Sequence, residues 1–114
     1  RETEAMLAAT GCTPLVDPDA EGAILFDIGG GSSEIASLGP SKPSRRGPPE
    51  PAMQGWTSLP LGVVTLAERH GGITVTREIF EAMVAEAAGH IAPFARAHTP
   101  HAATMHLLGT SGTV

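Results

Sequence analysis

Three consecutive glycines separate two apolar runs of this chain, and they are flanked by two acidic residues, Asp27 and Glu34. Apolar residues around such a turn predict a strand over 23–28, a tight turn, and a second strand over 32–38. Consecutive glycines permit positive φ and let a ligand approach the backbone closely, and successive N–H groups in a turn form a concave anion site. Because the two acids can hold a metal ion or a water beside that anion, we interpret this turn as one that binds a metal-chelated phosphate.

The composition limits the class of protein. A net charge of −5 argues against a nucleic-acid surface, and the Arg45-Arg46 pair lies in a Pro-rich stretch that is typical of a solvated loop. No apolar stretch approaches the ~18 residues that span a bilayer, and residues 1–10 lack the apolar region of a signal peptide. A single cysteine, Cys12, excludes an intrachain disulfide and fits a reducing compartment. We therefore expect a cytoplasmic protein without nucleic-acid or membrane partners.

The two ends of the chain suggest a larger parent protein. The chain begins at Arg1 rather than at a methionine, and it stops just after a small-residue turn over 109–113. With 114 residues it has the length of about one small domain. We expect a piece of a larger protein. A homodimer is an open alternative, because truncation would expose surface that the rest of the protein otherwise covers.

Helical patterns are clearest in two places. Good helix formers with acids in the first turn predict a helix over 2–10. Apolar residues at helical spacing after a Thr76 cap predict the longest helix, over 77–92, which Pro93 ends or kinks before an extension through 94–98. We expect the apolar face of this helix to lie in the core: Ile79, Phe80, Met83, Val84, Ala87 and Ile91.

The remaining segments complete an α/β pattern. We predict an acidic loop over 14–22 and an exposed Pro-rich loop over 40–52. A third strand is predicted over 53–59, a short helix over 62–69 and a fourth strand over 104–108. Three strands close in sequence form an antiparallel meander, and a fourth that follows a helix lies parallel to the first. The expected fold is a mixed sheet of order β-β-β-α-β with helices packed on it.

This order, with an Asp-x-Gly-x-Gly-type turn between the first two strands, resembles part of the actin-like (ribonuclease H-like) fold. Within that superfamily the chain resembles the exopolyphosphatase / guanosine pentaphosphate phosphatase family. Segment 27–34 resembles its second phosphate loop, 58–63 its next signature, and 109–113 its later Gly-Ser-Gly-Thr turn. The order and spacing of the three motifs carry the resemblance. It implies that 1–12 is the tail of a first lobe or an interlobe helix, and that 13–114 is the N-terminal part of a second lobe.

A fourth match concerns the helix at the start of the chain. Glu4 matches the second acid of the family's Glu-Glu-Ala segment, which is its proposed catalytic base, and Thr3 replaces the first acid. Three further departures are Arg1 in place of a frequent Gly, Ser33 in place of Thr, and Thr65 in place of a frequent Arg. The last of these puts one phosphate contact of the family in doubt.

The resemblance implies hydrolysis of a terminal phosphoanhydride bond of inorganic polyphosphate or guanosine pentaphosphate. In this interpretation Asp27 and Glu34 are hard oxygen ligands suited to Mg²⁺. Glu4 takes the proton from the attacking water, and whether Glu34 instead orients that water stays open. Phosphate oxygens are expected to meet the turn residues Gly29, Gly30, Gly31 and Ser32. The missing first lobe would supply the other half of the site, so we expect the isolated chain to be inactive.

Other interpretations compete with this one. An actin-like small-molecule kinase and a non-catalytic sensor of polyphosphate or nucleotide stay open, although the intact acids argue against the sensor. Ser111 does not match the Gly-x-Ser-x-Gly spacing of a nucleophile. A zinc site is disfavoured, because three histidines near the end of the chain have no Cys or acid at ligand spacing: His98, His101 and His106.

Overall fold

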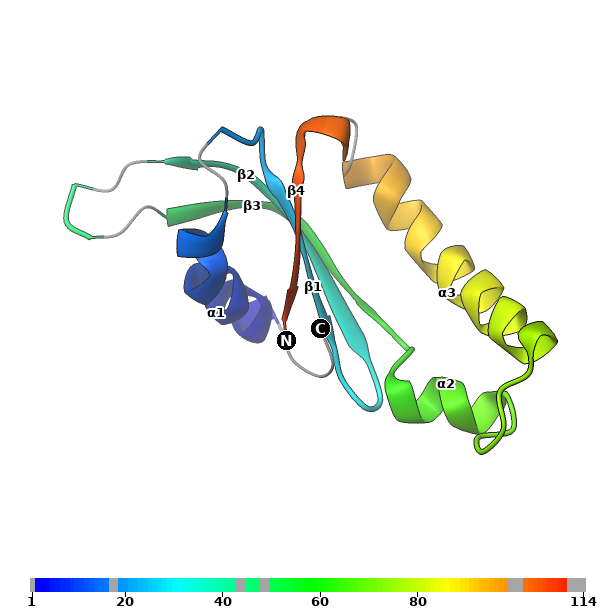
Figure 1. Ribbon diagram of the computed structural model, residues 1–114. Helices are drawn as coiled ribbons and strands as arrows, with labels where there is room; N and C mark the ends of the chain where they lie inside the picture. Colours follow the sequence, from blue (N-terminus) through cyan, green and yellow to red (C-terminus); the bar gives the residue numbers. More distant parts are fainter. Residues whose placement is uncertain (1, 17–18, 43–44, 48–49, 99–101, 111–114) are drawn as a thin grey trace.

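The computed structural model describes residues 2–16, 19–42, 45–47, 50–98 and 102–110, and it contains one mixed four-stranded sheet with helices on both faces (Figure 1). The strands lie in the order β3-β2-β1-β4. Both pairs within the meander are antiparallel, and β4 is parallel to β1. The predicted topology is therefore confirmed. The strand bounds are β1 Ala23–Ile28, β2 Ser33–Lys42, β3 Glu50–Leu59 and β4 His106–Thr110.

Side chains that alternate along the strands give the sheet two apolar faces. The first face packs against α1 (Glu2–Cys12), which ends two residues later than predicted and continues into a short 3-10 turn, Thr13–Leu15. The buried residues of this first cluster are Ala9, Cys12, Ala23, Leu25, Ala36 and Leu38. The second face packs against α2 (Val63–Arg69) and α3 (Arg77–His98). The buried residues of this second cluster are Ile35, Leu59, Leu61 and Phe94.

The Pro-rich segment carries more strand than the sequence suggests. β2 continues to Lys42 and β3 begins at Glu50, so both strands extend into the predicted loop over 40–52. Their pairing shifts register in this region, as expected where prolines remove ladder donors. Arg45 and Arg46 are exposed between the two strands.

The long helix α3 differs most from its prediction. It begins at the predicted Thr76 cap, whose hydroxyl accepts a hydrogen bond from the Ile79 N–H at 3.2 Å, and it runs past Pro93 to His98. The expected core position of its apolar stripe is largely wrong, because Phe80 is 59% exposed and Val84 51% exposed. In Figure 1 the helix extends away from the sheet toward its N-terminal end. Phe94, which periodicity did not single out, is the buried residue that attaches α3 to the sheet.

The C-terminal end of α3 is held by β2 and β3. The buried Ser37 hydroxyl donates to the His98 backbone carbonyl at 3.0 Å, which satisfies one of the carbonyls left open at a helix end. The His98 ring lies so close to Gly55 that a Cβ there would fall 2.5 Å from it. No helix in the described part of the chain is long and apolar enough to cross a membrane.

Candidate functional site

A row of polar side chains crosses the sheet at the end of β1. In the strand register Asp27 pairs with Glu34 of β2 and with Thr110 of β4, and Glu34 pairs with Ser58 of β3. Register partners project to the same face of a sheet, and residues two apart on a strand share a face. Because Leu25 belongs to the first cluster, this row lies on the face that α1 covers. We call these four residues, Ser58, Glu34, Asp27 and Thr110, the polar row.

Glu34 is held in place by two serines. The Ser58 hydroxyl donates to Glu34 Oε1 at 3.0 Å, and the Ser32 hydroxyl donates to the same oxygen at 3.2 Å. The hydroxyl of Ser32, a residue expected to meet phosphate, therefore orients Glu34. Ser58 was not predicted as a site residue, although its place at the end of a strand in a matched motif was a signal for it.

Asp27 faces Glu34 across the β1–β2 ladder without a hydrogen bond to any residue that the structure describes. Like charges placed directly opposite each other destabilise a sheet. The strands nevertheless present both carboxylates, half-buried, on one face. A cation or a network of waters between them would relieve this repulsion.

The Gly turn between these strands is fixed by α2. The carbonyl of Gly29 accepts the N–H of Val63 at 3.0 Å, and the carbonyl of Gly30 accepts the N–H groups of Val64 at 2.9 Å and Thr65 at 3.2 Å. The first N–H groups of a helix have no partner inside the helix. In this protein they are satisfied by the turn rather than by a side-chain cap.

These carbonyl contacts decide where the amides of the turn point. In a trans peptide the C=O and the following N–H lie on opposite sides, so the N–H groups of Gly30 and Gly31 point away from α2. The N–H groups of Gly30, Gly31 and Ser32 have no hydrogen-bond partner in the described part of the chain. Helix α2 packs on the second face through Leu66. The amides of Gly30 and Gly31 therefore point away from α2.

One expectation about the turn is not met. None of its three glycines has positive φ, a conformation that is found in this protein at Gly22, Gly71 and Gly72. The close approach to the turn depends on Gly62 instead, whose backbone packs directly against the carbonyls of Gly29 and Gly30. Gly71 and Gly72 follow α2 at the predicted helix end.

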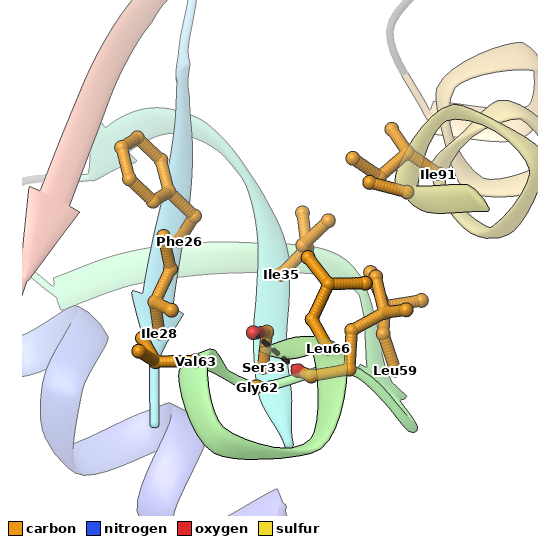
Figure 2. A pocket seen from close by; sticks show the side chains of 11 residues that line it. Phe26, Ile28, Ser33, Ile35, Leu59, Gly62, Val63, Leu66 and Ile91 are labelled. Carbon is orange, nitrogen blue, oxygen red and sulfur yellow. Dashed lines mark hydrogen bonds between the residues drawn. The ribbon is translucent and has the colours of Figure 1, made fainter. Parts of the chain in front are cut away.

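Two other residues that the sequence singled out, Glu4 and Ser33, lie outside the polar row. Glu4 lies in α1, which packs on the same face as the polar row, and its side chain lies outside the described structure. Ser33 points to the opposite face, where its hydroxyl donates to the Leu61 carbonyl at 2.7 Å (Figure 2). Ser111 and His101 lie outside the described residues.

The donor types of the polar row fit Mg²⁺ better than zinc. Two carboxylates supply hard oxygen ligands, and Mg²⁺ usually keeps several waters and substrate phosphates as its other ligands. The described residues contain no cluster of three His, Cys, Asp or Glu. His98 instead packs its ring against Phe94, with 4.8 Å between centroids.

An apolar pocket lies behind the Gly turn on the second face (Figure 2). It has a volume of about 260 Å³ and lies between the sheet, α2 and α3. Its walls include Phe26, Ile35, Leu59, Leu66 and Ile91. The residues described in its walls carry no charge, and the Ser33 hydroxyl among them is bonded to the Leu61 carbonyl, so they do not form a phosphate site.

Comparison with known proteins supports the resemblance. A crystal structure described as that of an exopolyphosphatase-like protein matches 98% of this chain, with 29% identity and a TM-score of 0.70. The chain covers 33% of that protein. No protein-family model and no curated protein sequence matches the chain. The α/β class and the resemblance to part of an exopolyphosphatase-like fold are thus confirmed.

Proposed function

We propose that this chain supplies one side of the active site of a phosphatase that cleaves terminal phosphoanhydride bonds of polyphosphate or guanosine pentaphosphate. The observation that carries this proposal is the turn at the end of β1. Its Gly30, Gly31 and Ser32 amides have no partner among the described residues, and the two acids that flank it, Asp27 and Glu34, face each other across the β1–β2 ladder. The match to an exopolyphosphatase-like protein supports the same class of reaction.

The turn would bind the phosphate that is transferred or its neighbour. Phosphoryl transfer is accelerated mainly by positioning and by neutralising charge on the equatorial oxygens. The N–H groups of Gly30, Gly31 and Ser32 are pre-aimed donors, because the carbonyls before them are already bonded to α2 or directed toward it. Such donors require little reorganisation when charge develops on the phosphoryl oxygens.

The polar row would organise the opposite side of the phosphate. Asp27 and Glu34 are the residues that would hold Mg²⁺, which supplies Lewis-acid neutralisation of phosphate charge when bound. Glu34 keeps one orientation because both serine hydroxyls bind its Oε1 atom. Its second oxygen stays available to a metal ion or to the attacking water.

Glu4 completes the proposal as the general base. α1 packs over the first face through Ala9 and Cys12, and Glu4 precedes them on the same helix. A carboxylate within hydrogen-bond reach of a water can remove its proton as the water attacks phosphorus. This role rests on the resemblance and on the face that α1 covers.

Phosphate release from polyphosphate and from guanosine pentaphosphate, measured with the natural full-length protein, tests the proposal. Glu4→Gln is expected to lower turnover by about 10²–10⁴-fold, the range for loss of a general base, and to leave substrate binding nearly unchanged. Thr3→Val, one residue away on α1, is the matched control and is expected to keep most of the activity.

The outcomes separate the competing functions. Turnover that Glu4→Gln leaves undiminished would remove Glu4 from the mechanism. Tight binding of polyphosphate with no release by the wild-type protein would favour a sensor, and ATP-dependent phosphorylation of a small molecule would favour a kinase. We also propose that residues 1–114 alone bind phosphate without turnover, so steady release by the purified chain would contradict a two-sided site.

A further inference from the structure

We propose that Gly62 and Thr65 are positioning residues that aim the amides of the Gly turn at phosphate. This inference rests on the proposed function and assigns these two residues a part in it. Neither residue belongs to the polar row, and both lie at the start of α2, on the far side of the turn from that row. They act through the backbone of the turn rather than by contact with the ligand.

Gly62 allows α2 to come close enough to hold the turn. A Cβ at this position would lie 2.3 Å from the carbonyl carbon and oxygen of Gly30 and 2.6 Å from the carbonyl oxygen of Gly29. These atoms belong to the backbone and cannot move aside as a flexible side chain would. A side chain at 62 would therefore separate the helix start from the two carbonyls that it binds.

Thr65 links the same two segments through its hydroxyl. The oxygen accepts the Gly62 N–H at 2.8 Å, so it fixes the residue that must approach the turn. Its proton lies within reach of the Gly31 carbonyl at 3.5 Å and of the Gly62 carbonyl at 3.3 Å. The Thr65 N–H also donates to the Gly30 carbonyl. Thr65 therefore restrains the peptides that carry the Gly31 and Ser32 amides.

This geometry gives Thr65 a function that an arginine would not perform in the same way. A long guanidinium side chain reaches a phosphate directly through several donors. The short hydroxyl of Thr65 contacts the backbone of Gly31 in the turn and of Gly62 at the start of its own helix. Thr65 thus acts on uncharged amides of the turn and brings no charge of its own.

The test measures binding of inorganic tripolyphosphate, with Mg²⁺, by calorimetry to the natural full-length protein that carries Glu4→Gln, so that the ligand is bound without being hydrolysed; every variant below is made in this parent. Gly62→Ala is expected to weaken binding about tenfold or more, as expected when a charge-assisted hydrogen bond is lost. Thr65→Val, which keeps the shape and removes the hydroxyl, is expected to weaken it about threefold, and Thr65→Ser to restore it. Gly89→Ala is the matched control: its Cβ meets nothing within 4 Å, so binding is expected to stay unchanged.

The outcomes distinguish this inference from the proposed function. If the Glu4→Gln parent binds no tripolyphosphate, both fail. If it binds and both Gly62→Ala and Thr65→Val bind equally well, the positioning role alone fails. Where Gly62→Ala does not fold, the Thr65→Val and Thr65→Ser pair decides. A merely structural Thr65 would lower the melting temperature without changing the dissociation constant, and that result would also overturn the inference.

Discussion

The two faces of the sheet are built differently. On the first face small side chains close the packing, and Ala9 and Ala23 have no exposed surface. On the second face α3 contributes one buried residue, Phe94, and a pocket of about 260 Å³ stays open beside it. Large apolar side chains such as Phe80 and Leu107 are exposed on this second side. The first face of the sheet is thus well packed, whereas the second face is only partly covered.

This difference matters for the proposed chemistry. Catalytic groups must be held within a fraction of an ångström by residues whose own positions are fixed. The polar row continues the strands that the closed first cluster fixes, since Asp27 follows Leu25 and Glu34 precedes Ala36 on the same face. The second face contributes in another way, because it carries α2, which holds the Gly turn from behind. Rigid packing supports the carboxylates, and backbone hydrogen bonds support the amides.

Among changes that compare the two faces, the largest expected effect comes from neutralising the polar row. In the full-length protein Asp27→Asn or Glu34→Gln is expected to lower the kcat/KM for phosphate release on the order of a thousandfold, about 4 kcal/mol. Each change also removes a like-charge pair from the ladder. The melting temperature without divalent cation is therefore expected to stay level or rise.

The control for this prediction is Glu86→Gln. Glu86 is an acid on the α3 side, paired with Arg69, and its neutralisation is expected to leave phosphate release unchanged. A polar row that only stabilised the fold would give the reverse pattern, with lower stability and little change in turnover. That result would place the active site elsewhere on the molecule.

A second prediction compares two phenylalanines of one helix. Phe94 is 7% exposed and Phe80 is 59% exposed. In the 114-residue chain Phe94→Ala is expected to lower the free energy of unfolding by about 3 kcal/mol, and Phe80→Ala by no more than about 0.5 kcal/mol. Chemical denaturation monitored by circular dichroism measures both. Equal losses would mean that the second face is packed along the whole of α3.

The sequence predicted local features well where several signals agreed. The two strands around the Gly turn, the antiparallel meander and the parallel fourth strand follow from apolar runs, turn residues and a helical crossover. These are contacts between segments that are close along the chain or joined by one regular element.

The sequence could not predict how separate segments meet. Periodicity assigned Phe80 and Val84 to the core, yet an apolar stripe shows which face a helix prefers and not whether a partner covers it. The role of Gly62 depends on the distance between two backbones 32 residues apart in sequence (Gly30 and Gly62), and no local pattern encodes it. Ser58 reaches Glu34 through the register of β2 and β3, which became known only with the sheet.

The smallest expected effect concerns the polar contact between α2 and α3. Arg69 Nη2 lies 3.1 Å from Glu86 Oε2, and the Arg69 side chain is 43% exposed. Exposed ion pairs contribute about 0.2–1 kcal/mol and weaken with salt, so Glu86→Gln is expected to cost no more than about 0.5 kcal/mol of stability. Urea denaturation at low and high salt measures the difference between wild type and variant. His70 Nε2 is buried, has no hydrogen-bond partner among the described residues, and lies 3.8 Å from Glu86 Oε1. A larger loss that salt does not change would therefore show that Glu86 supports His70 rather than Arg69, and that the second face is more firmly built than its exposed apolar residues indicate.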